Sequence, residues 1–593
     1  MPRDLFQSRI TKLIAVFIVG LAVLLIRLVD VQAINANDYK NRAENELYRV
    51  STLLAPRGEI TDVNGVPFAR SVSRINIVVD QQMIVNPQIT AEIAAPILKM
   101  TVSDVLSKIV GVKRWYLVAR NATPAQWSAL KDAFANYNDS LSRVDFNKRI
   151  VGFFPERNYT REYPGGTTVG SLVGFINQAG DGAAGLESAK NSILKGQDGK
   201  YVYANGIWAE IPGTQQQIQP AKAGDSVRLT IDRDIQYVAS NAIAKAVRAS
   251  NAKSGTVIVM DPKTGHILAH ATAPTFDPNK PVKLSDVHNA SVEEVYEPGS
   301  TGKVMTLAAA IEENAVTPTT VFTVPYKYRT PYKTFQDHES HPTQHLTTAG
   351  ILAVSSNTGT IQIGEKLSDQ KFYDYLRAFG VGSSTNSGLP GESAGLINAP
   401  KDWSGTTKPA MSFGQAYSVT AMQATSIFAT IANDGVRVEP TVIAGTSDAQ
   451  GHYTPAKQRD SVRVVSAETA AKMRLMMESV VSANGTAPSA AIPGYRVAGK
   501  TGTAQRVVNG RYSGYTASFI GFAPADKPRY VISVTIQAPQ GMHWGGVLGG
   551  PVFKEVMSYV LEAKHIPPTN TKVKPIPLNA AQLSAVTAKE KKQ

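Results

Sequence analysis

The spacing Ser-x-x-Lys occurs five times in the chain, and the copy at Ser300 has flanks that suit nucleophilic catalysis. The turn Pro298-Gly299 runs straight into the apolar stretch after Lys303, so Ser300 is predicted to lie at the start of a helix. There, free N–H groups and the helix dipole favour developing negative charge. Lys303, one helical turn further on, can take the Ser300 proton if burial lowers its pKa. The alternative is that Ser300 is an ordinary helix N-cap.

A second polar cluster, Ser355-Ser356-Asn357, stands at the end of a predicted helix over residues 346–356. A hydroxyl and an amide at this place can relay a proton and bind a substrate amide. Serine and asparagine are also common turn residues, because their side chains bond to the nearby backbone. The cluster alone leaves both interpretations open.

A third motif, Lys500-Thr501-Gly502-Thr503, raises the question of nucleotide binding. Residues 494–501 satisfy the phosphate-loop pattern G-x-x-x-x-G-K-[ST]. That loop needs a helix after it, whereas Val507-Val508 and the turn Asn509-Gly510 predict a strand and a hairpin. We therefore interpret the motif as part of a strand and not as a phosphate loop.

Other catalytic chemistries find little support. The chain has no cysteine, which excludes thiol catalysis, disulfides, cysteine-zinc sites and iron–sulfur clusters. His338, His341 and His345 lie near acidic residues, but Pro342 stands four residues after His338 and excludes an H-E-x-x-H helix. We interpret this stretch as a polar loop near the site, and we expect no metal and no cofactor. Pro298 also breaks the esterase signature G-x-S-x-G at Ser300.

Strands near both ends of the C-terminal half must hold these motifs, with helices between them. The pattern predicts strands over 256–260, 266–271, 516–523 and 529–537, and helices over 304–312, 346–356 and 420–433. This arrangement indicates an α+β fold whose antiparallel sheet, flanked by helices, is completed by the C-terminal part. Residues 66–250 mix short strands with helices and form an elongated mixed α/β region.

The N-terminal segment predicts a membrane anchor. Residues 13–26 are uncharged and apolar apart from Gly20, and extension to residue 33 gives a span of 21 residues, enough for a bilayer. Arg27 and Asp30 fall near one end and can pair at i, i+3. The basic residues ahead of the span predict a cytoplasmic N-terminus, with the rest of the chain outside. A cleaved signal peptide ending at 31–33 is the alternative.

The chain of 593 residues carries 61 basic and 47 acidic residues, and 61 − 47 gives a net charge of +14. Half of this excess lies in the first 12 residues and in residues 564–593, outside the expected globular part. We find no zinc-finger spacing and no basic zipper, and a location outside the membrane weakens the case for DNA binding, so we expect no nucleic acid. The basic C-terminal tail is expected to be solvated and disordered.

In chain order, the motifs Ser300-Thr-Gly-Lys303, Ser355-Ser-Asn357 and Lys500-Thr-Gly-Thr503 resemble the triple signature of penicillin-recognising serine enzymes. Over nearly the whole chain the sequence resembles the class B penicillin-binding proteins. The matching pieces are Arg57-Gly58, Asp62, Asn64-Gly65, Arg161-Glu-Tyr-Pro164, Gly185-Leu-Glu187, Leu229-Thr-Ile-Asp232, Phe379-Gly380, Gly391-Glu392 and Phe519-Ile-Gly-Phe-Ala-Pro524. The stretch Glu297-Pro-Gly-Ser300 is similar to that of septal, FtsI-type members, and elongation-type members are the alternative.

Two residues depart from the pattern of that class. Val63 stands where an arginine is common, which concerns the non-catalytic domain and not the chemistry. Gly302 replaces a bulkier, often aromatic residue between the serine and the lysine. We expect this glycine to loosen helix packing beside the nucleophile.

The resemblance implies a peptidoglycan D,D-transpeptidase that acts on stem peptides ending in D-Ala-D-Ala and reacts with β-lactams. Ser300 would form the acyl-enzyme, with Lys303 as general base. Ser355 would pass a proton to the leaving nitrogen, with Lys500 tuning it, and Asn357 would hold the donor amide. The resemblance further implies that Lys500, Thr501 and Thr503 bind the terminal carboxylate, that Gly502 keeps the strand edge clear, and that the N–H groups of Ser300 and Thr503 form the oxyanion hole.

The same resemblance implies a division into functional parts. These are a cytoplasmic N-terminus (1–12), a transmembrane anchor (13–33), a non-catalytic, dimerisation-type pedestal (34–250), a transpeptidase domain (251–566) and a basic, disordered tail (567–593). A membrane glycosyltransferase and cell-division proteins are the implied partners. Two rival functions stay open: a membrane-bound β-lactamase or sensor, and a non-catalytic scaffold of the division machinery.

Overall fold

The computed structural model describes residues 3–204, 214, 216–283, 286–508, 510–569, 571 and 575–590. The chain forms two compact units. One comprises Met1–Pro56, Val72–Thr160 and Gly196–Ala223, and the other Arg57–Ser71, Arg161–Lys195 and Gly224–Gln593. The three motifs all lie in the second unit.

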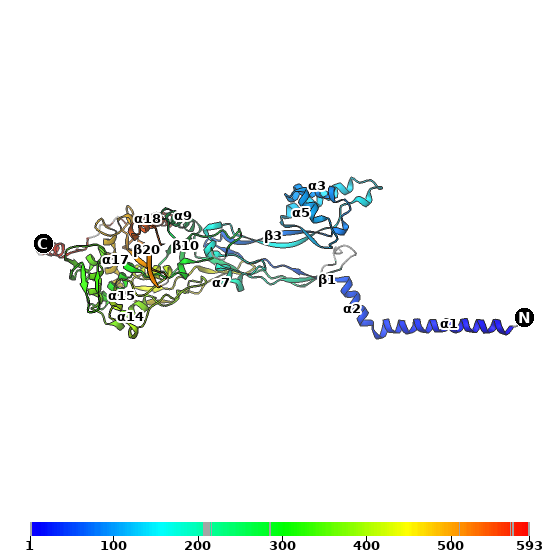
Figure 1. The fold of residues 1–593 in the computed structure, drawn as a ribbon, viewed down its shortest axis with the longest axis horizontal. Coiled ribbons are helices and arrows are strands. Elements are labelled where there is room, and N and C mark those ends of the chain that lie inside the picture. Colours follow the sequence, from blue (N-terminus) through cyan, green and yellow to red (C-terminus); the bar gives the residue numbers. More distant parts are fainter. Residues whose placement is uncertain are drawn as a thin grey trace. The chain divides into compact units, whose positions relative to one another are not determined.

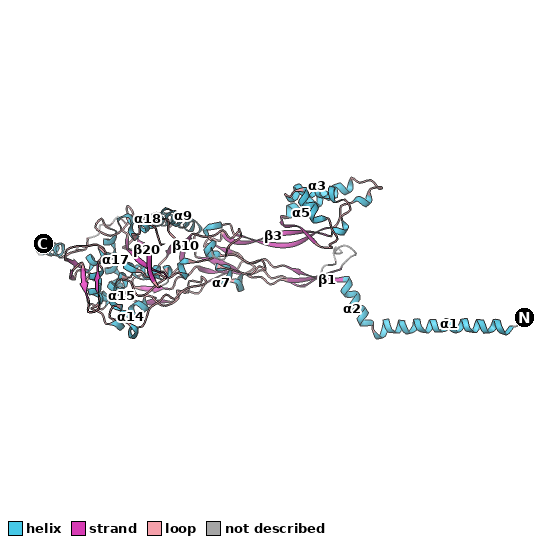
Figure 2. Cartoon of the chain, in the orientation of Figure 1, coloured by secondary structure: helices cyan, strands magenta, loops and turns pink. Residues whose placement is uncertain are grey.

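A five-stranded antiparallel sheet is the centre of the second unit. Its strands, in spatial order, are β10 (Ile267–Ala273), β9 (Ser254–Met260), β21 (Tyr530–Gln537), β20 (Arg511–Ala523) and β19 (Ala498–Val508). The first two strands in sequence thus pair with the last three, which confirms the predicted α+β sheet (Figure 2). The motif strand β19 is an edge strand.

Helices cover both faces of this sheet. Successive residues of a strand point to opposite faces, and a strand that is apolar at every position must be covered on both. On one face, α9 (Arg233–Ala249) and α18 (Gly545–Ala563) pack side by side (Figure 1), and Phe553 of α18 lies edge-on against Phe519 with ring centres 4.9 Å apart. On the other face, Thr425 of α16 (Ala421–Ala432) is hydrogen-bonded to Ser533 at 2.7 Å. Both layers exclude water from the strands, so β9, β10 and β21 are buried throughout.

The predicted alanine-rich helices are confirmed as α11 (Lys303–Glu312), α12 (Thr348–Ala353) and α16. Helix α11 is buried from Lys303 to Ile311, which explains why it is apolar all round. It follows a 3₁₀ turn (Gly299–Thr301) and packs against α13 (Asn357–Gly364) and α17 (Ala467–Val481). Helix α12 directly precedes the Ser355 cluster.

Two small hairpins stand between α11 and α12. Strand β11 (Val321–Val324) pairs with β14 (Gln344–Thr347), and β12 (Lys327–Arg329) pairs with β13 (Thr334–Gln336). Further elements of the C-terminal half are α10 (Ala290–Glu293), α14 (Asp369–Ala378), α15 (Thr407–Ser412), β15 (Val436–Val438) and β18 (Ser461–Arg463).

A second sheet in the same unit joins distant parts of the chain. Strand β2 (Ile60–Thr61) runs parallel to β8 (Ser226–Leu229), which pairs with β16 (Ile443–Ser447) and through it with β17 (Tyr453–Pro455). The Asp62 carboxylate accepts N–H bonds from Asn64 and Val66 and closes the predicted turn. The Val63 side chain is 37% exposed, so its departure from the class leaves no gap in the core.

Arg57 and Arg161 form a buried charge cluster with Glu187 in the same unit. Glu187, on α7 (Gly185–Ala189), is 0% exposed. Its carboxylate accepts hydrogen bonds from Arg57 Nε at 2.6 Å and from Arg161 Nε at 2.7 Å. Arg57 also donates to the Glu187 carbonyl and to the Asn191 side-chain oxygen. The cluster therefore ties together segments that are more than a hundred residues apart in sequence.

The first unit begins with α1 (Arg3–Val29), a π-helical turn (Asp30–Ile34) and α2 (Ala36–Leu47). Among the described residues, Gln7–Ile34 is long and apolar enough to cross a membrane. Arg27 pairs with Asp30 at 2.5 Å, as the i, i+3 spacing predicted. Helix α2 ends at Leu47, and the next residues, Tyr48–Leu53 (β1), pair with β6 (Gly199–Ala204), because their alternation suits a strand.

The rest of the first unit has its own core. Helices α3 (Pro87–Leu98), α4 (Val102–Ile109) and α5 (Pro124–Asp139) pack with β4 (Tyr116–Ala122) around buried aliphatic side chains. Strand β4 pairs with the second half of β3 (Pro67–Val79). The mixture of short strands and helices confirms the predicted mixed α/β character.

The C-terminal segment differs from the expected disordered tail. Residues 575–590 are ordered: Thr347 bonds to the carbonyls of Pro577 and Leu578, and Ala580–Glu590 forms helix α19. Ile576 and Leu578 pack against the core, and Gly350 leaves room for the Leu578 carbonyl. The prediction of disorder was wrong for these residues because it relied on the lysine content and not on these apolar side chains.

Candidate active site

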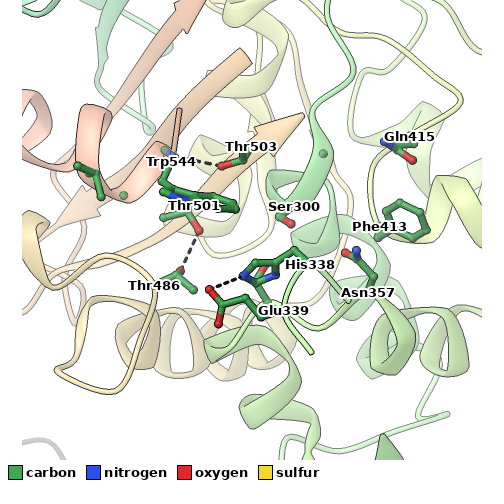
Figure 3. A pocket seen from close by; sticks show the side chains of 15 residues that line it. Ser300, His338, Glu339, Asn357, Phe413, Gln415, Thr486, Thr501, Thr503 and Trp544 are labelled. Carbon is green, nitrogen blue, oxygen red and sulfur yellow. Dashed lines mark hydrogen bonds and ion pairs between the residues drawn. The ribbon is translucent and has the colours of Figure 1, made fainter. Parts of the chain in front are cut away.

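One cavity of about 290 Å³ brings the three motifs together. Its lining includes five of the predicted site residues, Ser300, Ser355, Asn357, Thr501 and Thr503. Figure 3 labels four of them, Ser300, Asn357, Thr501 and Thr503, around the cavity. Lys303 and Lys500 are 0% exposed and reach Ser355 with their amino groups, and Gly502 lies between the two threonines on β19. All eight predicted residues therefore belong to one site.

Ser300 lies in the 3₁₀ turn that leads into α11, as the Pro-Gly turn predicted. Gly299 precedes it with φ +55°, a conformation that glycine adopts without strain, and its N–H donates to the Gly414 carbonyl at 2.8 Å. The turn is thereby pinned to a neighbouring loop. The serine is presented to the cavity at the start of a buried helix, where negative charge is stabilised.

Lys303 is the buried amine closest to Ser300 in sequence. Its Nζ donates to the Ser355 carbonyl at 2.5 Å and to Asn357 Oδ1 at 2.8 Å, and lies 3.3 Å from Ser355 Oγ. Burial lowers the pKa of Lys303 to about 7, and the negative charge of Asp337 opposes this shift. A large fraction of Lys303 is therefore neutral near pH 7 and can accept a proton.

Ser355 joins the two lysines. Its Oγ lies 2.9 Å from Lys500 Nζ, and its backbone is left-handed, with φ 61°. Burial and the nearby charge of Lys303 both lower the pKa of Lys500. A hydroxyl between two amines can pass a proton from one to the other, which favours the relay over the turn interpretation of this cluster.

Strand β19 carries the third motif along the edge of the sheet. Lys500 Nζ also bonds to its neighbour Thr501, whose hydroxyl meets Thr486 at 2.8 Å. Thr503 Oγ1 accepts the Gly545 N–H at 3.2 Å. A Cβ on Gly502 would collide with Ser518 and Thr301. The extended strand at 500–503 leaves no phosphate-binding helix N-terminus, so the phosphate-loop pattern is coincidental.

Asp337 holds the segment that carries Asn357. Its carboxylate, 4% exposed, accepts the backbone N–H groups of Asn357 at 2.5 Å and Thr358 at 3.0 Å, and the Ser356 hydroxyl at 2.7 Å. These donors form the N-terminus of α13, where a carboxylate is stabilising. Sequence reasoning missed this role, because Asp337 is 20 residues from Asn357 and no local spacing connects the two.

The comparisons with known proteins agree with this geometry. Residues 255–558 match the penicillin-binding protein transpeptidase domain, and residues 52–229 match the penicillin-binding protein dimerisation domain. The first match covers just over half of the chain and all three motifs. The chain belongs to the penicillin-binding protein family.

Relatives and solved structures of this family resemble the chain over most of its length. Penicillin-binding protein PbpB of Mycolicibacterium smegmatis is 37% identical over 83% of this chain and 76% of its own. The probable peptidoglycan D,D-transpeptidase PenA of Neisseria meningitidis is 30% identical over 97% of this chain and 95% of its own. Penicillin-binding protein 3 of Mycobacterium tuberculosis, solved with aztreonam, superposes with a TM-score of 0.70 at 30% identity over 89% of this chain and 100% of that structure.

The polar loop predicted beside the site is confirmed in this penicillin-binding protein. His338 and Glu339 line the cavity (Figure 3), and burial lowers the pKa of His338. The Trp544 ring lies 5.5 Å from the His338 ring and is tilted against His543, which stacks on Tyr515. Sequence reasoning missed this aromatic wall, because Trp544 and His543 stand in a loop outside the motifs.

The expected loosening beside the nucleophile is not found. A Cβ on Gly302 would collide with the hydroxyl of Tyr417 and the backbone of Gly414. Tyr417 is 3% exposed and occupies the volume that a larger residue at 302 would take. The expectation was wrong because a distant aromatic side chain fills the space.

Proposed function

We propose that this chain is a peptidoglycan D,D-transpeptidase in which Ser300 forms the acyl-enzyme. The observation that carries this proposal is the pair of fully buried lysines, Lys303 and Lys500, whose amino groups meet at Ser355 Oγ within reach of the serine cavity. Relatives of the chain are named peptidoglycan D,D-transpeptidases, including PenA and FtsI.

In the acylation step, neutral Lys303 takes the Ser300 proton as Oγ attacks the penultimate carbonyl of a stem peptide ending in D-Ala-D-Ala. The backbone N–H groups of Ser300 and Thr503 stabilise the resulting oxyanion. Collapse breaks the bond to the terminal D-Ala nitrogen. That nitrogen receives a proton through the Ser355 hydroxyl, which Lys500 and Lys303 resupply, so terminal D-Ala leaves and an ester to Ser300 remains.

In the second step, the amine of a neighbouring stem attacks the ester carbonyl. The amine loses one proton to the same relay, the new amide bond forms, and Ser300 Oγ leaves and regains its proton. Both steps reuse one set of groups, as microscopic reversibility requires.

The remaining residues bind the donor. Thr501, Thr503 and the charge of Lys500 hold the terminal carboxylate, and Asn357 orients the donor amide. Asn357 is itself fixed, since its Oδ1 accepts from Lys303 and its Nδ2 donates to the Gln336 carbonyl at 3.2 Å. The open edge of β19 can pair with an extended peptide. Gly502 allows the close packing behind that strand, because a side chain there would collide with Ser518 and Thr301.

In the cell, we place this reaction outside the cytoplasmic membrane during septal wall synthesis. The apolar helix at Gln7–Ile34 supports a single-pass anchor, and the basic residues before it favour a cytoplasmic N-terminus. The name FtsI of one relative, from Buchnera aphidicola, supports the septal role. A membrane glycosyltransferase and cell-division proteins are the proposed partners.

The test uses the full chain in detergent, a thioester analogue of the acyl-D-Ala donor and a D-amino acid acceptor. Wild type is expected to form the aminolysis product with the acceptor, and Ser300→Ala to form none. A wild type that forms no product would contradict the proposal. Rapid turnover of bound penicillin instead of a lasting adduct would favour the β-lactamase alternative.

A further inference from the structure

A second cavity, of about 490 Å³, lies next to the catalytic one in the same unit. Three short segments of the chain line both cavities. Their residues in the second cavity are Glu297, Ala416 and Arg506. Their residues in the catalytic cavity are Gly299, Gln415 and Thr503. The two cavities therefore follow one another along β19. None of the proposed catalytic roles uses the second one.

Arg506 lines this cavity at the position where β19 faces a β-bulge of β20. The register of β19 with β20 shifts between Gln505 and Val507, where Arg506 alone lies opposite Ser513 and Gly514, so the extra residue is on β20. Bulges next to active sites commonly re-aim one side chain. Within the part of the chain that the structure describes, Arg506 makes no hydrogen bond or ion pair, although it is half-buried.

Glu297 supplies the opposite charge in the same cavity. One carboxylate oxygen accepts the Ala416 N–H at 2.8 Å, and the other lies 3.5 Å from the exposed Tyr512 hydroxyl. Partial burial raises the pKa of Glu297. No ion pair joins it to Arg506 among the described residues, so each charge retains capacity for a ligand group.

We propose that this second cavity binds a zwitterionic amino-acid centre on the side chain of the donor's third stem residue, with Glu297 taking its ammonium group and Arg506 its carboxylate. An arginine suits a carboxylate because its planar fork can donate two parallel N–H bonds. The inference rests on the proposed function, since it extends the donor site of the same reaction.

The distances along the strand allow this assignment. Thr503 and Arg506 are three residues apart, about 10 Å along an extended strand. The third stem residue precedes the acylated D-Ala by one residue, about 3.8 Å between Cα atoms, and a four-carbon side chain adds roughly 5 Å. A donor paired with the edge of β19 thus reaches the level of Arg506 with the end of that side chain.

The test compares three depsipeptide donors that end in D-Ala-D-lactate and differ only at the third residue. That residue is meso-diaminopimelate, lysine or norleucine, and the readout is kcat/KM for lactate release with water as acceptor. Wild type is expected to favour diaminopimelate over norleucine by about 10-fold or more, because one tenfold step corresponds to about 1.4 kcal/mol, the scale of one or two partly exposed charge contacts.

Variants assign each charge through ratios measured within one protein. In Arg506→Gln, the rate with diaminopimelate is expected to fall to the rate with lysine. In Glu297→Gln, which keeps the acceptor for the Ala416 N–H, the advantage of lysine over norleucine is expected to disappear. The matched controls are Arg511→Gln on β20 and Glu468→Gln on α17, neither of which lines the cavity, and both should keep the wild-type ratios.

The outcomes separate this inference from the proposed function. Equal rates with all three donors in a wild type that is acylated by penicillin would overturn the zwitterion site alone. Unchanged ratios in both cavity variants would do the same. Discrimination that follows the third residue of an added acceptor, and not of the donor, would also overturn it. A wild type that reacts with neither penicillin nor any donor overturns the proposed function as well.

Discussion

Two clusters of buried charge in the same unit differ in how their charges are balanced. In one, Glu187 is buried between Arg57 and Arg161, and each guanidinium bonds to a different carboxylate oxygen. In the other, Lys303 and Lys500 are equally buried, yet both contact Ser355 and neither forms an ion pair within the described residues.

The difference separates a structural role from a chemical one. A buried ion pair keeps its groups charged, because the partner replaces the lost water. A buried lysine without a carboxylate in contact loses its proton more easily, so its pKa falls towards the pH at which an enzyme works. Asp337 is intermediate between these cases. Its negative charge raises the pKa of Lys303 without direct contact, while its oxygens accept hydrogen bonds from the N-terminus of helix α13.

The largest effect on chemistry is expected from Lys303→Arg. Arginine keeps its proton at any working pH, so it cannot act as a base, and acylation by penicillin should fall by at least about 1,000-fold. The rate of fluorescent-penicillin labelling measures this, and the melting temperature checks the fold. Labelling within a few-fold of wild type would contradict the role of Lys303.

The largest effect on stability is expected from Glu187→Gln. The substitution leaves two buried guanidinium groups without a counter-charge, which should reduce the free energy of unfolding by about 3–5 kcal/mol. Denaturant unfolding measures the loss. The comparison of the two clusters fails if this variant is as stable as wild type, or if Lys303→Met, without its charge, loses as much stability as Glu187→Gln does.

Asp337→Asn should change the pH dependence of acylation. The Asp337 charge raises the pKa of Lys303 against the effect of burial, so its removal lowers that pKa further. Lys303 then becomes neutral at lower pH, and the acid limb of the pH–rate profile moves to lower pH. The plateau rate should fall about tenfold as Asn357 loses its anchor. Glu339→Gln, an exposed carboxylate near the same loop, is the control; an unshifted limb in Asp337→Asn contradicts the electrostatic role.

A smaller effect is expected from Gly302→Ala, which tests the packing beside the lysines. The added methyl group collides with the Tyr417 hydroxyl and should reduce stability by about 1–3 kcal/mol. Because that hydroxyl is buried and has no hydrogen-bond partner among the described residues, Tyr417→Phe should be nearly neutral and should recover part of the loss. A double-mutant cycle in thermal unfolding measures the coupling; strictly additive effects contradict the contact.

The smallest effect is expected at an exposed pair. Lys472 and Glu468 lie 2.7 Å apart at i, i+4 on α17, but water screens them. Glu468→Gln should change the free energy of unfolding by less than about 0.5 kcal/mol. A loss comparable to that of Glu187→Gln would show that burial does not govern the difference between charge pairs.

Local patterns in the sequence were enough to predict the sheet, the alanine-rich helices and the pair of Ser300 and Lys303. Ser300 and Lys303 are three residues apart, and an apolar helix after a Pro-Gly turn places both. The motif residues at 355 and 500 came from a resemblance, since their meeting at one hydroxyl depends on contacts across 145 residues.

The contacts that the sequence did not predict connect distant segments of the chain through tertiary packing. Asp337 reaches α13 from a separate hairpin, Tyr417 fills the space beside Gly302, and Leu578 returns from the C-terminal segment to α12. Each depends on where a loop lies in space, and neither periodicity nor composition carries that information.

The most direct measurement is the intact mass of the protein after incubation with a fluorescent penicillin, followed by mapping of the labelled peptide, for wild type and Ser300→Ala. We expect one lasting adduct on Ser300, absent from the variant, that forms faster as the pH rises through about 7, where Lys303 loses its proton. An adduct on another residue, or none in wild type, would contradict this expectation.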